Sequence, residues 1–208
     1  MVAKLTPLCI IIMIASMIGF TTENLWIWFR FGYFDNRGML LPGLLGYGMA
    51  MILVYMVLGI PEKPVFFGRQ LHFKNMLLSK LYYFLGAGVL VSIGEIVLGN
   101  FVEKSAGIVW WNYSTVPLHI GKYTSVPTSM GFALLITIFM GSIFPRLYKW
   151  AVSINTPVVQ GIVLVLFLLF VGDYLYETWY MLSLRKIHKI WKIKLGTGAL
   201  INYVRKLV

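Results

Sequence analysis

The acidic side chains are the residues of this sequence best suited to chemistry. The 208-residue chain has seven of them: Glu23, Asp35, Glu62, Glu95, Glu103, Asp173 and Glu177. Most lie within or beside long apolar segments, where an ionisable group is costly and usually marks a functional site. A carboxyl group removed from water can keep its proton and act as a general acid, while an ionised carboxylate can act as the base. The candidate catalytic residues are Glu95, as the central acid, with Asp173, Glu23 and Glu177.

Two loops rich in aromatic and hydrogen-bonding residues follow acid-bearing segments. One contains Asn36-Arg37-Gly38 and the other contains Trp110-Trp111-Asn112-Tyr113-Ser114. Tryptophan and tyrosine are expected at membrane interfaces, but the polar groups between these rings are more typical of the mouth of a binding pocket. The candidate substrate-binding residues are Asn36, Arg37, Glu103, Trp110, Trp111, Asn112, Tyr113, His119, Lys122 and Tyr176.

The sequence predicts no cofactor and no dedicated metal site. The histidines at positions 72, 119 and 188 are far apart, and the single cysteine, Cys9, excludes a disulfide framework and a cysteine-rich metal site. A divalent cation such as Mg²⁺, held by several carboxylates, is a minor alternative. No glycine-rich phosphate-binding loop is present, so we do not expect the chain itself to be an ATPase.

Composition defines the surroundings of these residues. Hydrophobic residues make up 59% of the chain and charged residues 12%, and the mean hydropathy is +0.81. Soluble domains have about 25% charged residues, so a soluble enzyme is excluded, and so is a disordered chain. The net charge of +11 favours anionic lipid headgroups rather than nucleic acid as the partner. We expect a multi-pass integral membrane protein of the plasma membrane.

The apolar segments predict an all-α bundle of about five transmembrane helices. A span needs about 20 mainly apolar residues, and the candidates are residues 5–31, 39–60, 77–102, 128–148 and 157–184. Residues 1–184 would form this bundle. Residues 185–208 are basic and place Ile187, Ile190 and Trp191 on one face at helical spacing, which predicts an interfacial amphipathic helix on anionic lipids.

Helical periodicity places the acids on shared faces. In the third span, small and polar residues recur at steps of three or four: Gly88, Ser92, Glu95, Gly99 and Glu103. In the fifth span, Asp173, Tyr176, Glu177 and Tyr180 share a face. Small residues allow close helix approach and polar residues then face the interior. We therefore expect acids from several helices to meet in one chamber near one membrane surface.

These runs, in this order, resemble the putative ABC-transporter type IV membrane family. The resemblance rests on Asn36-Arg37-Gly38, Glu95 and Glu103 on one helix, and Trp110-Trp111-Asn112-Tyr113-Ser114. It extends over roughly residues 23–135 and implies a permease. The chain departs from the family pattern where Asn112 replaces an aspartate and Lys122 replaces an arginine.

A second, weaker resemblance is to integral-membrane carotenoid and lycopene-cyclase proteins. It rests on a glutamate-bearing helix, the aromatic loop with Tyr113, and Val126-Pro127 at the start of a helix. The paired glutamates that follow the proline in those proteins are replaced here by Thr128 and Ser129.

Three functions follow from these features. The favoured one is an intramembrane cyclase- or isomerase-type enzyme acting on a lipid-soluble polyprenyl or terpenoid-like molecule, because the polar residues gather at one end only. The alternative is a permease-like transporter subunit, which would need a homo-oligomer or a separate ATPase subunit. In the third, the acids only pair with Arg30, Arg37 or Lys122 and hold the helices together.

Overall fold

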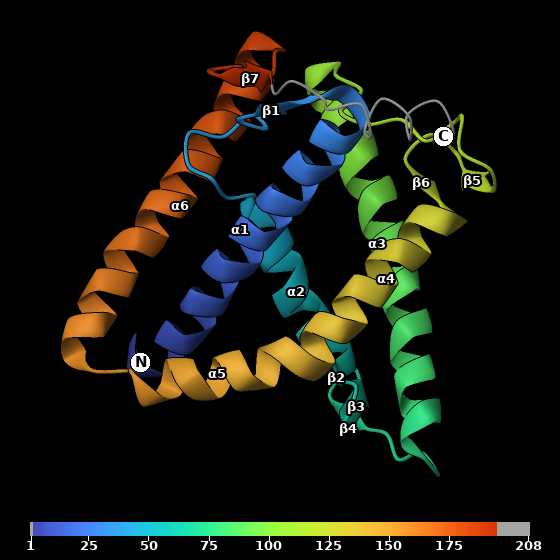
Figure 1. The fold of residues 1–208 in the computed structure, drawn as a ribbon, viewed down its shortest axis with the longest axis vertical. Coiled ribbons are helices and arrows are strands. Elements are labelled where there is room, and N and C mark those ends of the chain that lie inside the picture. Colours follow the sequence, from blue (N-terminus) through green and yellow to red (C-terminus); the bar gives the residue numbers. More distant parts are fainter. Residues whose placement is uncertain (1, 195–208) are drawn as a thin grey trace.

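The computed structural model describes residues 2–194 and is built almost entirely from helices (Figure 1). The helices are α1 (Val2–Phe31), α2 (Leu45–Leu58), α3 (Met76–Ala106), α4 (Val126–Ile138), α5 (Phe144–Ser153) and α6 (Pro157–Leu184), with a π-helical segment η1 (Phe139–Ile143) between α4 and α5. Four segments are long and apolar enough to cross a membrane: Leu5–Phe29, Met76–Ala106, Val126–Ser153 and Pro157–Leu184. The predicted all-α, multi-pass class is confirmed, and the last span has the predicted bounds.

The second expected span is shorter than predicted. Helix α2 has 14 residues and is therefore about 21 Å long, less than the roughly 30 Å of a bilayer core. Residues 39–44 form an apolar loop instead of its first turns, because Pro42 cannot supply a helical N–H. The N–H groups of Leu40 and Leu41 donate to the Asp173 side chain on α6 instead of entering a helix.

The fourth span is bent. Helices α4 and α5 are continuous through η1. The bend lies near Pro145, in the first turn of α5, which lacks the N–H that a regular helix would use. Figure 1 shows α5 lying across the end of the bundle at which the N-terminus lies. Helix α5 buries Phe144 and Ala151 and exposes Arg146 and Lys149, an arrangement typical of a helix at the membrane surface.

Short antiparallel strands connect the helices. At one end β1 (Tyr33–Asp35) pairs with β7 (Lys192–Lys194), and β5 (His119–Ile120) pairs with β6 (Thr124–Ser125). At the other end β2 (Gly59–Ile60), β3 (Lys63–Phe66) and β4 (Arg69–Gln70) form a small sheet between α2 and α3.

The expected interfacial helix of the tail does not form over residues 185–194. Helix α6 ends at Leu184, and the following residue, Arg185, has a φ of +51° that stops the helix. The chain then continues without helix into β7. The prediction is wrong here because the backbone of this segment bonds to β1 and to Asn36. Residues 195–208 of the predicted helix lie outside the described residues.

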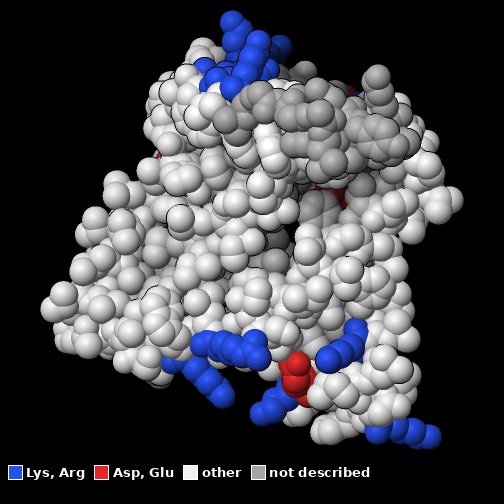
Figure 2. All heavy atoms as spheres, viewed as in Figure 1, with Lys and Arg blue, Asp and Glu red and all other residues white. Residues whose placement is uncertain are grey.

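The core lies where α1, α2, α3 and the α4–η1 segment meet. Its buried members include Ile11, Val54, Tyr83, Ala133 and Met140. Figure 2 shows basic side chains at the two ends of the molecule and a band with few charged side chains between them on this face. This distribution fits a bundle that crosses the bilayer with both ends at the headgroups.

Candidate functional site

The loop between α1 and α2 ties together both halves of the polar end. Residues 36–39 form a tight turn in which the Met39 N–H donates to the Asn36 carbonyl at 2.8 Å, with φ of +51° at Arg37 and +75° at Gly38. A Cβ at position 38 would lie 3.0 Å from the Ile187 side chain. The turn therefore uses glycine for both its backbone conformation and its packing.

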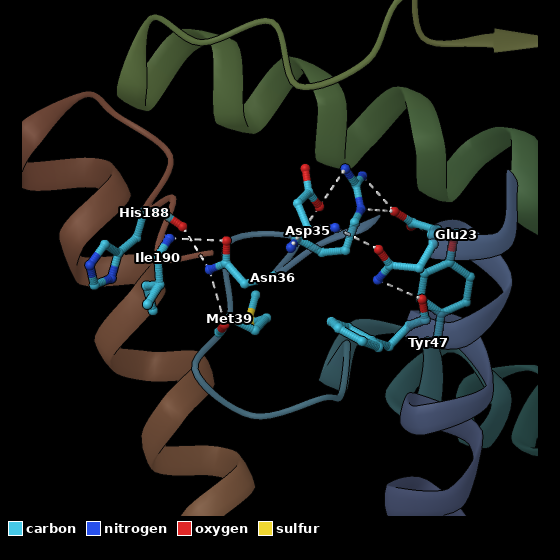
Figure 3. Close-up of polar contacts among 10 residues, drawn as sticks. Glu23, Asp35, Asn36, Met39, Tyr47, His188 and Ile190 are labelled. Carbon is cyan, nitrogen blue, oxygen red and sulfur yellow. Dashed lines mark hydrogen bonds and ion pairs between the residues drawn. The ribbon is translucent and has the colours of Figure 1, made fainter. Parts of the chain in front are cut away.

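Asn36 fastens this loop to the tail. Its side-chain amide donates to the carbonyl of His188 at 2.8 Å and to that of Met39 at 3.1 Å, and it accepts the N–H of Ile190 at 3.2 Å. Figure 3 shows Asn36 between the tail residues and the loop. Because the side chain is 1% exposed and its bonds go to backbone, Asn36 is a structural clamp.

Glu23 is occupied by Arg37 and Tyr47. The Arg37 Nε and Nη2 atoms lie 2.7 and 2.6 Å from Glu23 Oε2, and the Tyr47 hydroxyl donates to Oε1 at 2.7 Å (Figure 3). Arg37 Nη1 also lies 3.8 Å from Asp35 Oδ1. The charge of the Glu23 carboxylate is therefore balanced by Arg37, and this ion pair fixes Arg37 against α1.

The two acids of α6 are also partnered. Asp173 accepts the N–H groups of Leu40 and Leu41 at 3.0 and 2.9 Å. Glu177, 4% exposed, lies 2.8 Å from Nδ1 of His188, whose ring stacks on Tyr180 with centroids 4.4 Å apart. Tyr176 meets the same imidazole edge-on at 6.3 Å. These residues join α6 to the loop and the tail.

Glu103, near the end of α3, forms an ion pair with Lys122 and accepts the Tyr123 hydroxyl at 2.5 Å. The hydrogen bond to this carboxylate raises the pKa of Lys122 above its usual value. The Trp111 Nε1–H donates to the Tyr123 carbonyl at 2.8 Å, so the aromatic loop folds back over α3. Trp110 packs beside Trp111 with ring centroids 6.0 Å apart.

Two further loop residues serve the loop itself. The Asn112 side chain accepts the N–H of Ser114 at 2.8 Å, and His119 Nδ1 lies 2.9 Å from the Gly121 carbonyl oxygen. Both side chains belong to exposed residues. Their described contacts are local turn contacts, which leaves a role in ligand binding as a prediction.

Glu95 differs from the other acids of this end. The Thr124 hydroxyl donates to Glu95 Oε2 at 2.6 Å, and the hydroxyls of Ser129 and Tyr113 hydrogen-bond to the same carboxylate. Ser129 also bonds to Thr124 at 2.8 Å and to Ser92 at 2.9 Å. Among the side chains that the structure describes, Glu95 thus hydrogen-bonds to hydroxyl groups and forms no ion pair with a cation.

Tyr113 connects Glu95 to Glu23. Burial raises the pKa of the Tyr113 phenol, and the negative charges of Glu95 and Glu23 raise it further. The charges of an α1 acid and an α3 acid therefore both act on this phenol. Asp173 and Glu177 belong to a second group of contacts, with the loop and the tail. Within the described residues, no three His, Cys, Asp or Glu side chains gather as metal ligands.

Several hydrogen-bond partners of these acids were not predicted from the sequence. Tyr47, Thr124 and Ser129 hold Glu23 and Glu95, and His188 holds Glu177. For Thr124 and Ser129, the sequence feature that could have indicated them is Ser125-Val126-Pro127, a pattern typical of a helix start. This helix start places the hydroxyl groups on either side of it beside α3. The contact between His188 and Glu177 was not predicted, because residues 185–208 were expected to form an interfacial helix.

The family described as "Putative ABC-transporter type IV" has a sequence model that matches residues 10–178. The chain belongs to this family. The match covers the spans and the loops that hold all the acids, so the putative ABC-transporter type IV resemblance is confirmed over a longer stretch than predicted. No curated protein and no solved structure matches the chain, and the resemblance to lycopene cyclases gains no support. This type IV family member is an integral, multi-pass membrane protein.

Proposed function

We propose that this protein is the membrane-spanning subunit of a transporter in which Glu95 binds the positively charged part of the solute. The observation that carries the proposal is that, among the described side chains, Glu95 hydrogen-bonds only to hydroxyl groups, with Thr124 at 2.6 Å. An ionisable residue within a membrane helix is a functional-site hypothesis by default. Membership of the putative ABC-transporter type IV family favours transport over the enzyme expected from the one-sided distribution of polar residues.

The partners of the other acids support the choice of Glu95. Glu23 and Glu103 have Arg37 and Lys122, and Asp173 has two backbone N–H groups. Displacing such partners would leave a charge or a backbone group unpaired, which is costly away from water. A cation at Glu95 would displace only neutral hydroxyl donors, which can turn and offer their oxygen atoms instead.

The oxygen atoms around Glu95 suit a small monovalent cation. The ligands available at this site are all oxygen atoms, from the carboxylate, Thr124, Ser129 and the Tyr113 phenol. Hard cations and ammonium groups prefer oxygen ligands to nitrogen or sulfur. Thr124 and Ser129 are 0% and 3% exposed, so the site has few competing waters. The solute class that fits is a sodium ion or a small organic ammonium or guanidinium ion.

A partner would supply the energy. The sequence has no phosphate-binding glycine loop, so ATP-driven transport would require a separate ATPase subunit, with a homo-oligomer as the alternative assembly. Lipids would surround the spans in either case.

The acid–base enzyme is the second candidate, and the same residue supports it. A carboxyl group in a membrane helix beside the Tyr113 phenol could hold and pass a proton to a lipid-soluble, terpenoid-like molecule. Glu23, Asp173 and Glu177 are less suited to act as its base, because each already accepts hydrogen bonds from a partner.

Binding of probe cations tests the transport proposal. The protein in nanodiscs would be titrated with radiolabelled sodium, methylammonium and guanidinium by scintillation proximity. We expect saturable binding of at least one probe, weakened about tenfold or more in Glu95→Gln. Glu62→Gln, an exposed acid at the other end, is the matched control and should bind as the wild type does. Absence of binding for all three probes, or unchanged binding in Glu95→Gln, would contradict the proposal.

A further inference from the structure

The small sheet between α2 and α3 ends in a strained aromatic turn. Phe66 pairs with Arg69, and the two residues between them, Phe67 and Gly68, have φ of +46° and +82°. Two-residue hairpin turns with both φ values positive favour Asn-Gly or Asp-Gly. A bulky aromatic residue in this conformation is an outlier, and such strain is typical of positions retained for function.

The two aromatic rings at this turn are largely exposed. Phe67 is 70% exposed and Phe66 is 52% exposed, and the rings meet edge-on with centroids 4.9 Å apart. The Phe67 N–H donates to the carbonyl of Val57 in the last turn of α2 at 3.1 Å. The turn therefore lies beside α2, whose outer face also exposes Leu53 and Met56.

The turn also lies at the level of the first turns of α3. The Tyr82 hydroxyl donates to the Val65 carbonyl at 3.0 Å, and Ser79 Oγ donates to the Pro61 carbonyl at 2.5 Å. Tyr82 is six residues into α3, or about 9 Å from its start. Figure 1 shows the strands beside the lower part of α3 rather than beyond its end. This depth corresponds to the boundary between headgroups and acyl chains for a helix that crosses the membrane.

The charges around the sheet are mainly basic. Lys63, Arg69 and Lys74 are exposed, with Glu62 as the acid of this segment, and Figure 2 shows basic side chains gathered at this end. Strand β3 runs from Lys63 to Phe66, so the turn at Glu62 and the turn at Phe67 are about 13 Å apart. The Phe67 turn points back toward α2, and the charged turn lies at the other end of the strand.

We propose that the Phe66–Phe67 turn inserts into the interfacial region of the surrounding leaflet, with Lys63 and Arg69 on the phosphates of anionic lipids. Phenylalanine is among the side chains that surface segments bury at the boundary between headgroups and acyl chains, and lysine and arginine near the surface each add attraction to anionic headgroups. The partner is the bilayer, since the aromatic turn continues the lipid-facing residues of α2. A contact with a second protein is the competing outcome of the test.

Site-specific labelling tests the insertion. A Cys9→Ser background allows one environment-sensitive fluorophore to be attached at Phe67→Cys or, as the matched position at the opposite turn, at Glu62→Cys. In nanodiscs with anionic lipid we expect blue-shifted emission at position 67 and strong quenching by lipids spin-labelled near the headgroup. Position 62 should show water-like emission and weak quenching. Equal, water-like emission at both positions would overturn the proposal.

A protein contact gives a different result. Blue-shifted emission at position 67 without quenching by spin-labelled lipid would also overturn the proposal and assign the turn to a protein interface. Phe67→Asn separates folding from insertion, because asparagine suits the positive φ. We expect this variant to keep its thermal unfolding temperature in detergent but to lose the additional stabilisation that anionic over zwitterionic nanodiscs give the wild type. A variant that keeps that lipid-dependent increase would contradict the proposal.

Discussion

The amide of Asn36 donates to the carbonyl oxygen of His188 across 152 positions of sequence, at 2.8 Å. This bond joins the loop after the first span to the segment after the last. The same loop carries Arg37, which binds Glu23 on α1, and Leu40 and Leu41, which bind Asp173 on α6. One short loop therefore joins α1, α6 and the segment that follows α6.

Asn36→Ala should destabilise the protein. The substitution removes three hydrogen bonds and leaves backbone groups of Met39, His188 and Ile190 without this partner. We expect a loss of about 2–3 kcal/mol in the free energy of unfolding, measured by denaturant titration in detergent. Proteolysis should become faster within residues 185–194. An unchanged cleavage rate there would show that Asn36 does not hold the tail.

Glu23→Gln should destabilise the protein by about 1–2 kcal/mol, because Arg37 loses its carboxylate partner while its side chain remains three-quarters buried. The double variant Glu23→Gln, Arg37→Gln should recover part of the loss, since it also removes the guanidinium that the single variant deprives of Glu23. Thermal unfolding of the two single variants and the double variant gives the coupling between the pair. Strictly additive effects would mean that the pair contributes nothing beyond its separate residues.

Lys122→Gln should matter less as the pH becomes strongly alkaline. The pKa of Lys122 is raised in the folded protein by its bond to Glu103, so the folded state binds the proton more tightly than the unfolded state. The resulting stabilisation is fully present below the ordinary lysine pKa and is lost as the pH rises through the raised value. The unfolding temperatures of wild type and variant should converge over that range. Because the pair is exposed, salt should also reduce the difference.

Gly48→Ala should disrupt the contact between α1 and α2. A Cβ at position 48 would lie 2.2 Å from the backbone oxygen of Ile12, whereas a Cβ at Gly46 on the same helix would meet nothing within 4 Å. We expect Gly48→Ala to cost about 1–3 kcal/mol through overpacking. Gly46→Ala, the matched control, should be neutral or slightly stabilising. Similar unfolding temperatures for both variants would show that α1 can move away from α2.

The spans were predictable because hydrophobicity is a local property of the chain. Residues 157–184 form α6 as expected, and the acids of the first, third and last spans lie at the predicted end. Helix α2 and the tail were not predictable to the same degree. Residues 185–194 have a helix-compatible pattern, but β1 and Asn36 offer their backbone other hydrogen-bond partners. Residues 39–44 are apolar but contain Pro42, and the N–H groups of Leu40 and Leu41 donate to Asp173 instead.

The sequence by itself determined that acids would be buried in a membrane bundle near basic and aromatic loops. Only the tertiary structure decided which acid has which partner. Glu23 binds Arg37, Glu103 binds Lys122 and Glu177 binds His188, while Glu95 has hydroxyl partners from β6, α4 and the aromatic loop. The physical reason is that hydrogen bonds and ion pairs depend on distances of about 3 Å, and those distances arise only when helices far apart in sequence pack together.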